Sequence, residues 1–323
     1  MTKVLGMGNA LVDILIRIND EKILEELNMP KGTMHLVEAD FAGELLARLT
    51  DYSQQLSSGG SAANTIHGLA HLGVETAFIG KVGKDDFGKF FSQDMQNAGI
   101  HPQLLSSDTE SGRAIALITP DSERTFGTYL GAAIELSAAD LKPEMFSGYE
   151  YFHIEGYLVQ NHELIETAVK MAREAGVKVS LDLASYNVVE DNKDFLLDIT
   201  RKYVDILFAN EEEAFAFTGK NPEEAINIIS ESCETAIVKT GASGSLVKKG
   251  NTIFKIDPVK ATSVDTTGAG DLYAAGFIYG LSNGMLPDKC GEIGSLLAGR
   301  VIEVMGAKMS DDRWKEVLTE GGL

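Results

Sequence analysis

Seven consecutive residues, Asp265–Asp271, combine a run of small residues with a carboxylate at each end. Their sequence is DTTGAGD, and the apolar, helix-like stretch LYAAGFIYGL follows. Gly268, Ala269 and Gly270 at a helix start would leave backbone N–H groups free, which together with the helix dipole form an anion site. Asp271 would then lie beside a bound phosphate, where a carboxylate accepts a proton from an attacking hydroxyl. The alternative is a helix cap, which is the better interpretation of this motif taken alone.

A second segment rich in small residues, Ser57–Asn64, has the sequence SSGGSAAN and leads into another helix-like stretch. The paired glycines Gly59 and Gly60 let the backbone approach a ligand closely. Asn64 offers both a hydrogen-bond donor and an acceptor, which suits a polyhydroxylated molecule. A flexible loop with an ordinary helix cap explains this motif equally well by itself.

The two motifs together are more specific than either. In this order and separation they resemble the two signatures of the PfkB family of carbohydrate kinases, G-G-x-x-x-N at Gly59–Asn64 and D-T-x-G-A-G-D at Asp265–Asp271. The resemblance extends from GNALVDI near the start to Gly306–Ser310 near the end, and within the family it is greatest to adenosine kinases. It implies a ribokinase-like three-layer α/β/α sandwich and transfer of the ATP γ-phosphoryl group to a hydroxymethyl group, with Mg²⁺ as cofactor.

The resemblance implies that Asp13 binds substrate hydroxyls together with Gly60 and Asn64. A carboxylate accepts two hydroxyl hydrogen bonds at once, as a vicinal diol requires. A turn former at a strand end is the alternative, but an acidic residue between Val12 and Ile14 needs a partner. We therefore favour the functional role for Asp13.

The resemblance also implies residues for the nucleotide and its metal ion. Asn210 and Glu213 match the family's N-x-x-E motif, which organises Mg²⁺ and its water shell, and they lie one helical turn apart. A solvated helix start is the alternative for this run of glutamates. Thr240, Gly241 and Gly244 would lie along the ribose and phosphates of ATP.

Two further expectations concern positive charge. Arg124 resembles a lid arginine that reaches the transferred phosphate and neutralises its charge, although such arginines are also often solubilising charges. Asp265 and Thr267, with the loop Gly306–Ser310, resemble the segments that coordinate a monovalent cation, which makes K⁺ a further expected ligand. Lys308 lies inside this loop, and its ammonium is an alternative occupant of the cation's place.

Three other patterns are rejected. Gly6–Leu11 begins like a dinucleotide fingerprint, but it lacks the third glycine and precedes a β-like run, so NAD is not expected. Gly83–Phe90 nearly matches a Walker A loop, but Phe90 stands where a hydroxyl would bind Mg²⁺. His67 and His71 have the spacing of helical metal ligands without a third ligand, so we expect them on a helix packed against the sheet.

Short β-branched runs alternate with helix-like stretches, which predicts βαβ units, a mostly parallel sheet covered on both faces and ligands at the strands' C-terminal ends. The clearest predicted strands are Tyr151–Ile154, Val177–Leu181, Asp205–Phe208 and Ala236–Val238.

Three other segments are strand-like without helices between them: Val12–Ile18, Gly32–Val37 and Gly112–Tyr129, the last containing a predicted hairpin turn at Pro120–Glu123. We expect them to form a small antiparallel lid, from about residues 12–18, 32–37 and 112–130, on a single kinase domain spanning residues 1–323. Edge strands of the large sheet are the alternative.

Composition limits the partners. Of 323 residues, 44% are hydrophobic and 24% charged, as in an ordinary globular protein. The formal charge of −20 should repel phosphate backbones and anionic lipids, so neither nucleic acid nor a membrane is expected. Mg²⁺ and backbone N–H groups can overcome that field locally for ATP. Two cysteines without disulfide or metal spacing, and an N-terminus unlike a signal peptide, predict a cytoplasmic protein.

We therefore predict a kinase that phosphorylates a small nucleoside or sugar, as a monomer or a homodimer. A nucleoside needs an apolar slot for its base, which Met34, Leu36, Ile115 and Leu117 would provide. One rival is a ribokinase-type or fructokinase-type sugar kinase. A rival of another class is a catalytically silent nucleotide or sugar sensor, which the presence of Asp271 disfavours.

Overall fold

The computed structural model describes residues 2–121 and 123–323, which contain a large and a small β-sheet. The strands of the large sheet are β1 (Lys3–Met7), β5 (Glu75–Gly83), β6 (His101–Ser107), β9 (Tyr151–Glu155), β10 (Lys178–Asp182), β11 (Ile206–Asn210), β12 (Thr235–Lys239), β13 (Ser245–Lys249) and β14 (Thr252–Ile256). Their order is β14-β13-β12-β11-β10-β9-β1-β5-β6. All neighbours from β12 to β6 are parallel, and β13 and β14 add an antiparallel hairpin. The mostly parallel sheet predicted from the sequence is thus present.

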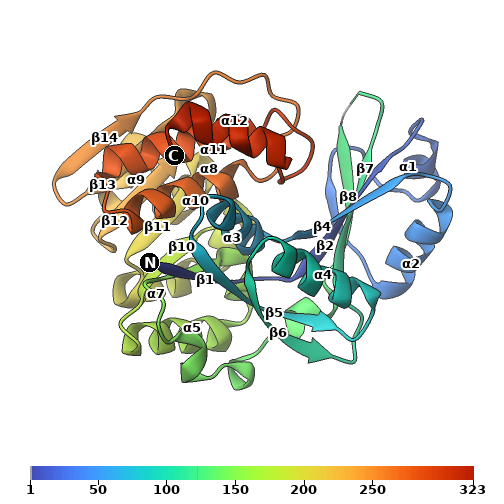
Figure 1. Ribbon diagram of the computed structural model, residues 1–323, viewed down its shortest axis with the longest axis horizontal. Helices are drawn as coiled ribbons and strands as arrows, with labels where there is room; N and C mark the ends of the chain where they lie inside the picture. Colours follow the sequence, from blue (N-terminus) through green and yellow to red (C-terminus); the bar gives the residue numbers. More distant parts are fainter. Residues whose placement is uncertain (1, 122) are drawn as a thin grey trace.

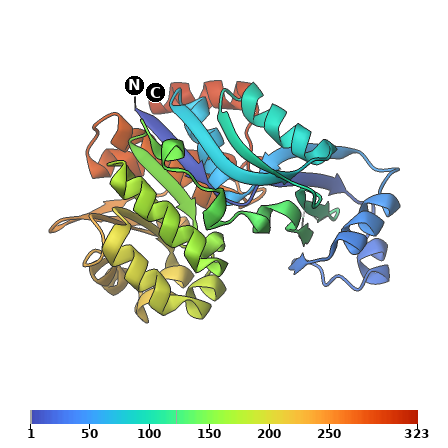
Figure 2. The same ribbon diagram turned by 90° about the horizontal axis from the view of Figure 1, so that it is seen from below.

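Helices cover both faces of this sheet, giving three layers (Figures 1 and 2). One face carries α3 (Ser61–His71), α4 (Asp86–Asn97), α10 (Ala269–Ser282), α11 (Pro287–Val301) and α12 (Asp311–Gly321), and the other carries α5 (His162–Glu174), α7 (Lys193–Tyr203), α8 (Glu211–Thr218) and α9 (Pro222–Ile229). A short helix α6 (Tyr186–Asp191) and the 3₁₀ turns η1 (Gly131–Glu135), η2 (Ala138–Asp140), η3 (Pro143–Phe146), η4 (Gly156–Gln160) and η5 (Gly241–Ser243) complete this body. No helix in the described ranges is long and apolar enough to cross a membrane.

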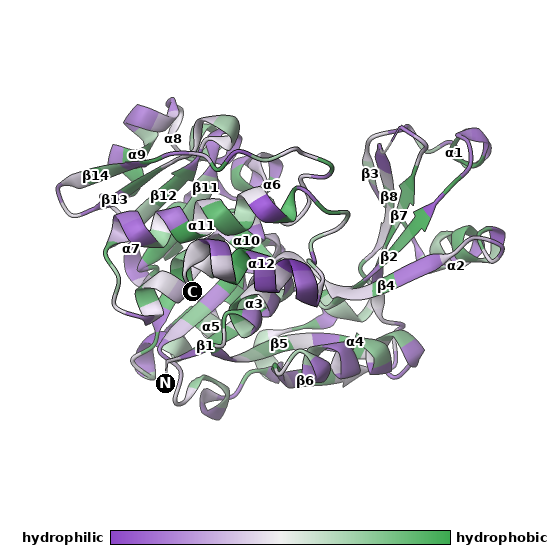
Figure 3. Cartoon of the chain, turned by 45° about the horizontal axis from the view of Figure 1, so that its top comes forward, coloured by the Kyte–Doolittle hydropathy of each residue, from purple (hydrophilic) through white to green (hydrophobic). Residues whose placement is uncertain are grey.

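The apolar residues of the central strands divide between two cores because successive side chains point to opposite faces. In β11, Ile206 and Phe208 join the core beneath α10 and α11, whereas Leu207 and Ala209 join the core beneath α5 and α8. Burial on both sides explains why these strands are almost continuously hydrophobic, as Figure 3 shows for β11 and β12.

The small sheet contains β2 (Leu11–Arg17), β3 (Met34–Leu36), β4 (Gln54–Gly59), β7 (Gly112–Ile118) and β8 (Arg124–Tyr129), in the order β3-β8-β7-β2-β4. It projects from the body at the right of Figure 1, with α1 (Lys22–Glu26) and α2 (Ala39–Arg48) beside it. The alternative that these strands are edges of the large sheet is therefore wrong.

The predicted antiparallel arrangement of the small sheet is only partly right. β2–β4 and β7–β8 are antiparallel, but β2–β7 and β3–β8 are parallel. β4 was not predicted, because its sequence QQLSSG lacks a β-branched or alternating pattern. Ser122, in the predicted hairpin turn, lies outside the described residues.

Candidate active site

A cleft of about 2060 Å³ lies where the ends of the central strands face the small sheet. The carboxyl ends of parallel strands meet at one edge of a sheet, so residues far apart in sequence converge there. The strand-end residues that line the cleft are Asn9, Glu155, Asp182, Asn210 and Lys239. Residues of both sequence motifs line it too, so the structure joins the two predicted halves of the site.

The DTTGAGD segment forms the start of α10. Gly268 is the N-cap with φ +77°, a left-handed conformation that favours glycine, and a Cβ there would lie 2.6 Å from the Cβ of Ala307. Asp265 shapes the preceding turn, since its Oδ1 accepts a hydrogen bond of 3.0 Å from the Thr267 N–H. Gly268, Ala269 and Gly270 line the cleft at a helix N-terminus, as an anion site requires.

Asp271 lies in the first turn of α10 and receives two side-chain hydrogen bonds from α3. The Ser61 hydroxyl donates to Oδ1 at 2.7 Å, and the Asn64 amide donates to Oδ2 at 2.9 Å. Burial raises the pKa of Asp271 to about 6, although both of these hydrogen bonds lower it. Asp271 is therefore more than a helix cap, because its carboxylate lines the cleft and is held in place by a second element.

Asn64 links Asp271 and the predicted acceptor pocket. Its amide nitrogen is bound to Asp271, while its Oδ1 is buried and has no hydrogen-bond partner among the described residues. A buried unpaired acceptor in a native site calls for a ligand or a water molecule. The hydroxyl of an acceptor would satisfy it.

Asp13 lines the cleft from β2, close to the glycine pair. A Cβ at Gly59 would lie 2.2 Å from Asp13 Oδ2, so only glycine leaves room for this carboxylate. Gly60, with φ +99°, lies against the Asn9 carbonyl and also lines the cleft. Burial raises the pKa of Asp13 to about 7, although the charge of Lys308 opposes the shift.

The loop at Gly306–Ser310 directs Lys308 away from Asp265. The ammonium donates to Ser58 Oγ at 2.7 Å and to Asp94 Oδ2 at 2.9 Å, and it lies 3.0 Å from His67 Nε2. The alternative that it takes the cation's place beside Asp265 is therefore wrong. His67 is buried within α3 in this polar cluster, as expected for a packed helix.

The positive charge beside Asp265 comes instead from Arg124, at the start of β8. Its guanidinium forms an ion pair with Asp265 and donates to Thr267 Oγ1 at 2.8 Å. Asp265 Oδ2 also accepts the Gly306 N–H at 2.5 Å. Arg124 thus joins the small sheet to the turn that precedes the anion site.

Asn210 and Glu213 form a reciprocal capping box at the start of α8. The Asn210 N–H donates to Glu213 Oε2 at 2.8 Å, and the Glu213 N–H donates to Asn210 Oδ1 at 2.8 Å. Glu213 is only 2% exposed, so the alternative of a solvated helix start is wrong for this residue. Burial, followed by the charge of Asp182, raises the pKa of Glu213 to about 7.

The β12–β13 connection, which the sequence predicts to hold ATP, forms part of the wall of the cleft. Gly241 and Gly244 line it with positive φ values of 51° and 93°, and a Cβ at Gly244 would lie 2.0 Å from the Ile256 carbonyl oxygen. Thr240 is not among the lining residues, but its N–H closes the turn on Gly244 O at 2.8 Å.

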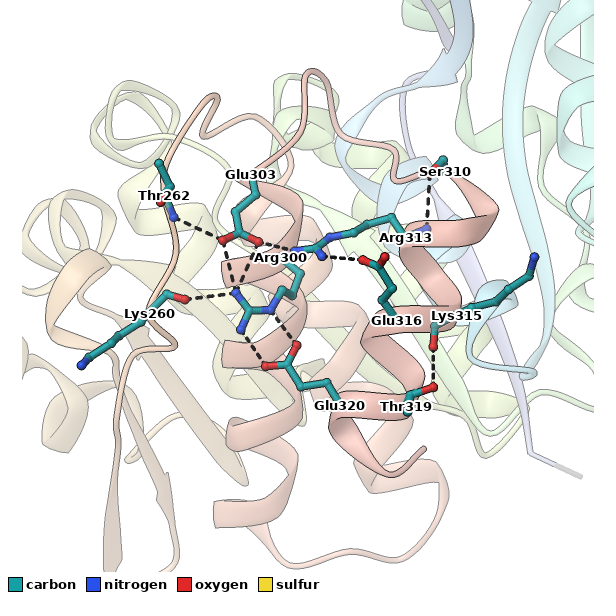
Figure 4. A network of polar contacts seen from close by, with 10 residues as sticks. All are labelled: Lys260, Thr262, Arg300, Glu303, Ser310, Arg313, Lys315, Glu316, Thr319 and Glu320. Carbon is teal, nitrogen blue, oxygen red and sulfur yellow. Dashed lines mark hydrogen bonds and ion pairs between the residues drawn. The ribbon is translucent and has the colours of Figure 1, made fainter.

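The cleft is also lined by the strap, which we define as residues 258–263, between β14 and the DTTGAGD segment. The strap begins next to the β12–β13 connection, since a Cβ at Gly244 would lie 3.1 Å from the Pro258 nitrogen. Its lining residues are Pro258, Val259, Lys260, Ala261 and Ser263. A polar network on α11 and α12 holds it (Figure 4). Arg300 donates to the Lys260 carbonyl at 3.0 Å, and Glu303 accepts the Thr262 N–H at 3.2 Å.

Sequence reasoning missed three cleft residues at strand ends. Glu155 is 1% exposed, accepts the N–H groups of Asn9 at 2.9 Å and Ala62 at 2.8 Å, and has its pKa raised to about 7 chiefly by burial. Asp182 and Lys239 form an ion pair of 2.7 Å. A signal was present: Glu155, Asp182 and Lys239 are charged residues that directly follow a predicted apolar strand.

The predicted base slot is half right. Met34 and Leu36 line the cleft and are 61% and 64% exposed. Ile115 and Leu117 are fully buried on the opposite face of the small sheet, so that part of the prediction is wrong. Ala114, one residue away, lines the cleft instead, since alternate residues of a strand face opposite sides.

A three-layer parallel sheet with an anion site, a buried carboxylate beside it and a separate small sheet over the cleft defines a ribokinase-like small-molecule kinase. The pfkB family carbohydrate kinase model matches residues 38–313, and the chain belongs to this family.

Solved structures of high similarity cover the whole chain. A probable sugar kinase protein from Rhizobium etli has 34% identity and a TM-score of 0.88, covering 100% of this chain and 99% of that one. The adenosine kinase from Sinorhizobium meliloti has 34% identity and a TM-score of 0.87, covering 99% of each chain. The adenosine kinase of Saccharomyces cerevisiae is 27% identical over 331 residues, 95% of this chain and 96% of that protein. The predicted family, fold class and kinase activity are confirmed.

Proposed function

We propose that this kinase phosphorylates the hydroxymethyl group of a nucleoside, with ATP as donor and adenosine as the leading acceptor. The observation that carries this proposal is an apolar surface in the same cleft as Asp13, on β3 and η1. Met34, Leu36 and Ile134 line the cleft and are each at least 60% exposed, which is unusual for large apolar side chains. A planar base would cover this surface, whereas a free sugar would leave it exposed to solvent.

Asp13, Gly60 and Asn64 would hold the ribose hydroxyls, the first through two acceptor oxygens. Asp271, with a pKa of about 6, is mostly ionised at neutral pH and would accept the proton of the attacking hydroxyl. The Gly268–Gly270 amides would stabilise the charge of the phosphoryl group. The small sheet would act as a lid that excludes water. Arg124 is paired with Asp265 outside the cleft lining in this structure, and it would turn to the transferred phosphate when the lid closes.

Gly241 and Gly244 would hold the ATP ribose and phosphates beside the strap, with Thr240 closing their turn. Asn210 and Glu213 would hold Mg²⁺ through water. The neighbouring carboxylates of Asp182 and Glu213 fit a cation, because burial and then the charge of Asp182 raise the pKa of Glu213, and a cation would offset both effects. Bound with ATP, Mg²⁺ neutralises phosphate charge.

A monovalent cation at Asp265 and Thr267 remains a proposal, and Arg124 already balances the charge of Asp265. Rates that are equal in K⁺ and in a bulky organic cation at constant ionic strength would exclude K⁺ activation. A cytoplasmic location, a single domain over the whole chain and a monomeric or homodimeric state also remain proposals. The free thiols of Cys233 and Cys290 agree with a reducing compartment.

The acceptor is best tested by measuring ADP release with adenosine, other nucleosides, ribose and fructose at fixed Mg²⁺·ATP. We expect the highest kcat/KM with adenosine. Preference for ribose or fructose would establish the sugar-kinase rival, and the absence of acceptor-dependent ADP release would favour the silent sensor. Adenosine should also bind more weakly when Met34 and Leu36 are both replaced by Ser.

A further inference from the structure

Negative charge is concentrated around the place of phosphoryl transfer. The acidic residues of the central site are Asp13, Glu155, Asp182, Glu213 and Asp271. The phosphoryl group adds charge on its own oxygens in the transition state. Among the described residues that line the cleft, the lysines are Lys239 and Lys260, and none is an arginine. The local source of positive charge is therefore limited to a few groups.

Lys239 is the less exposed of these two lysines, with a side chain that is 15% exposed, whereas Lys260 is exposed on the strap. Lys239 is the last residue of β12, and its Nζ donates to Asp182 Oδ2 at 2.7 Å. A Cβ at Gly270 would lie 3.1 Å from this nitrogen, the nearest contact of that position. The ammonium thus lies against the anion site, beside the residue that precedes Asp271.

The surroundings keep Lys239 protonated. Burial alone would lower its pKa, but the carboxylates of Asp182, Glu213 and Asp271 outweigh burial and raise the pKa above its ordinary value. An ammonium has three donors, and Asp182 is its one hydrogen-bond partner recorded in the described part of the chain. The remaining donors are available to a ligand in the cleft.

We propose that Lys239 is a further catalytic residue, which donates a hydrogen bond to a non-bridging oxygen of the phosphoryl group while that group passes from ATP to the acceptor. This role rests on the proposed function. In the step, the bond from phosphorus to the ADP oxygen breaks and its electron pair leaves with ADP. The acceptor oxygen forms the new bond to phosphorus, and its proton goes to Asp271. Lys239 keeps all its protons and, with the Gly270 amide, stabilises the charge.

Replacement of Lys239 by Met, which keeps the length of the side chain but removes its charge, tests this role. We expect kcat to fall by ~10²–10³-fold, the usual effect of losing one preorganised donor to a developing anion. The KM for the acceptor should change by less than about threefold, because Lys239 lies away from Asp13.

Lys81→Met is the matched control. The side chain of Lys81 on β5 is 14% exposed and forms an ion pair with Asp140 at 2.9 Å. The side chain of Lys239 is 15% exposed and forms an ion pair with Asp182 at 2.7 Å. Lys81 does not line the cleft. Both variants lose a partly buried ion pair, but only the Lys239 variant should lose kcat. Wild-type-like kcat in folded Lys239→Met would overturn the proposal.

Chemical rescue separates catalysis from structure. In Lys239→Ala, methylammonium should restore part of kcat in a concentration-dependent way, whereas a bulky quaternary amine should not, and equal responses to both would contradict the role. If Lys239→Met and Lys239→Ala do not fold, Lys239→Arg, which keeps the positive charge, gives the answer. Its kcat should stay within about tenfold of the wild type, and a fall by several powers of ten in folded Lys239→Arg would refute the proposal. Failure of the wild type to phosphorylate any nucleoside or sugar would instead refute the proposed function.

Discussion

Asp271 is held by side chains that lie 210 and 207 positions away in sequence, Ser61 and Asn64. Their hydrogen bonds fix the direction of the carboxylate, and burial raises its pKa to about 6. A base in this range is ionised at neutral pH and remains basic enough to take a proton in the transition state. At the scale of single residues, the site therefore depends on contacts between two distant motifs.

Replacement of Asp271 by Asn should lower kcat by ~10²–10⁴-fold, since an amide of the same shape cannot accept the proton. The melting temperature and the affinity for ATP should remain close to those of the wild type. Single-turnover kinetics and calorimetric titration measure the two properties separately. A variant with near-normal kcat would show that Asp271 is not the base.

Replacement of Asp13 by Ala should remove two charge-assisted hydrogen bonds to the ribose diol, each worth ~1.5–3 kcal/mol. Acceptor affinity should fall at least ~100-fold, while ATP binding should barely change. A 2′-deoxynucleoside should bind the wild type more weakly than the ribonucleoside, but the Ala variant should discriminate much less. Equal discrimination by both proteins would make Asp13 a structural residue.

At the scale of elements, the strap has neither helical nor strand hydrogen bonds to hold it, so its position depends on α11 and α12. Arg300 contacts the strap and pairs with Glu320 at 2.6 Å (Figure 4). Arg313 on α12 pairs with Glu303, the residue that accepts the strap's Thr262 N–H, so it also bears on the strap. Arg173 on α5 pairs with Asp205 at 2.8 Å, and neither residue lines the cleft. Arg300 and Arg173 therefore allow the effect of strap position to be separated from a general loss of stability.

Arg300→Gln should raise the KM for ATP about tenfold, the effect of losing roughly 1.4 kcal/mol of positioning. The KM for the acceptor should stay unchanged, because we propose that the strap borders the nucleotide and not the acceptor. Arg173→Gln is the control, with a loss of one ion pair but an unchanged KM for ATP. Equal rises of this KM in both variants would indicate a general loss of stability.

At the scale of the whole molecule, the cleft makes folding depend on pH. Four carboxyl groups that line the cleft have raised pKa values. The pKa is about 7 for Asp13, Glu155 and Glu213 and about 6 for Asp271. The unfolded values are near 4, so the folded protein binds more protons than the unfolded chain between about pH 4 and 7. The free energy of unfolding must then decrease as the pH rises through this window.

The buried histidines His67 and His153 act in the opposite direction, since burial lowers their pKa values to about 3 and about 4. The four carboxyl groups with a raised pKa outnumber the two histidines with a lowered pKa. The protein without ligands should therefore melt at a higher temperature at about pH 5.5 than at about pH 7.5. Glu155→Gln should flatten this dependence, whereas Glu231→Gln at an exposed position should not. Scanning calorimetry over this range would contradict the assignment if Glu155→Gln kept the full slope.

Much of the fold and part of the site follow from the sequence alone. The central strands are predictable because burial on both faces makes their sequences continuously apolar. The starts of the helices are predictable because small and capping residues bind or expose the backbone N–H groups of the first turn, which is a local effect. The predicted strands at 151–154, 177–181, 205–208 and 236–238 all lie within β9 to β12 or within one residue of them. These local signals also placed Gly268–Gly270 at a helix start with Asp271 in its first turn, while the anion site itself stays a prediction.

Only the tertiary structure decided which distant groups meet. The folded chain pairs Lys239 with Asp182 and Arg124 with Asp265. It places the ammonium of Lys308 beside Asp94 and not at the predicted cation site beside Asp265. It also turned Ile115 and Leu117 away from the cleft. Ion pairs between separate strands depend on the order of strands in the sheet, and the face of a strand changes with a shift of one residue, so neither is encoded in local sequence.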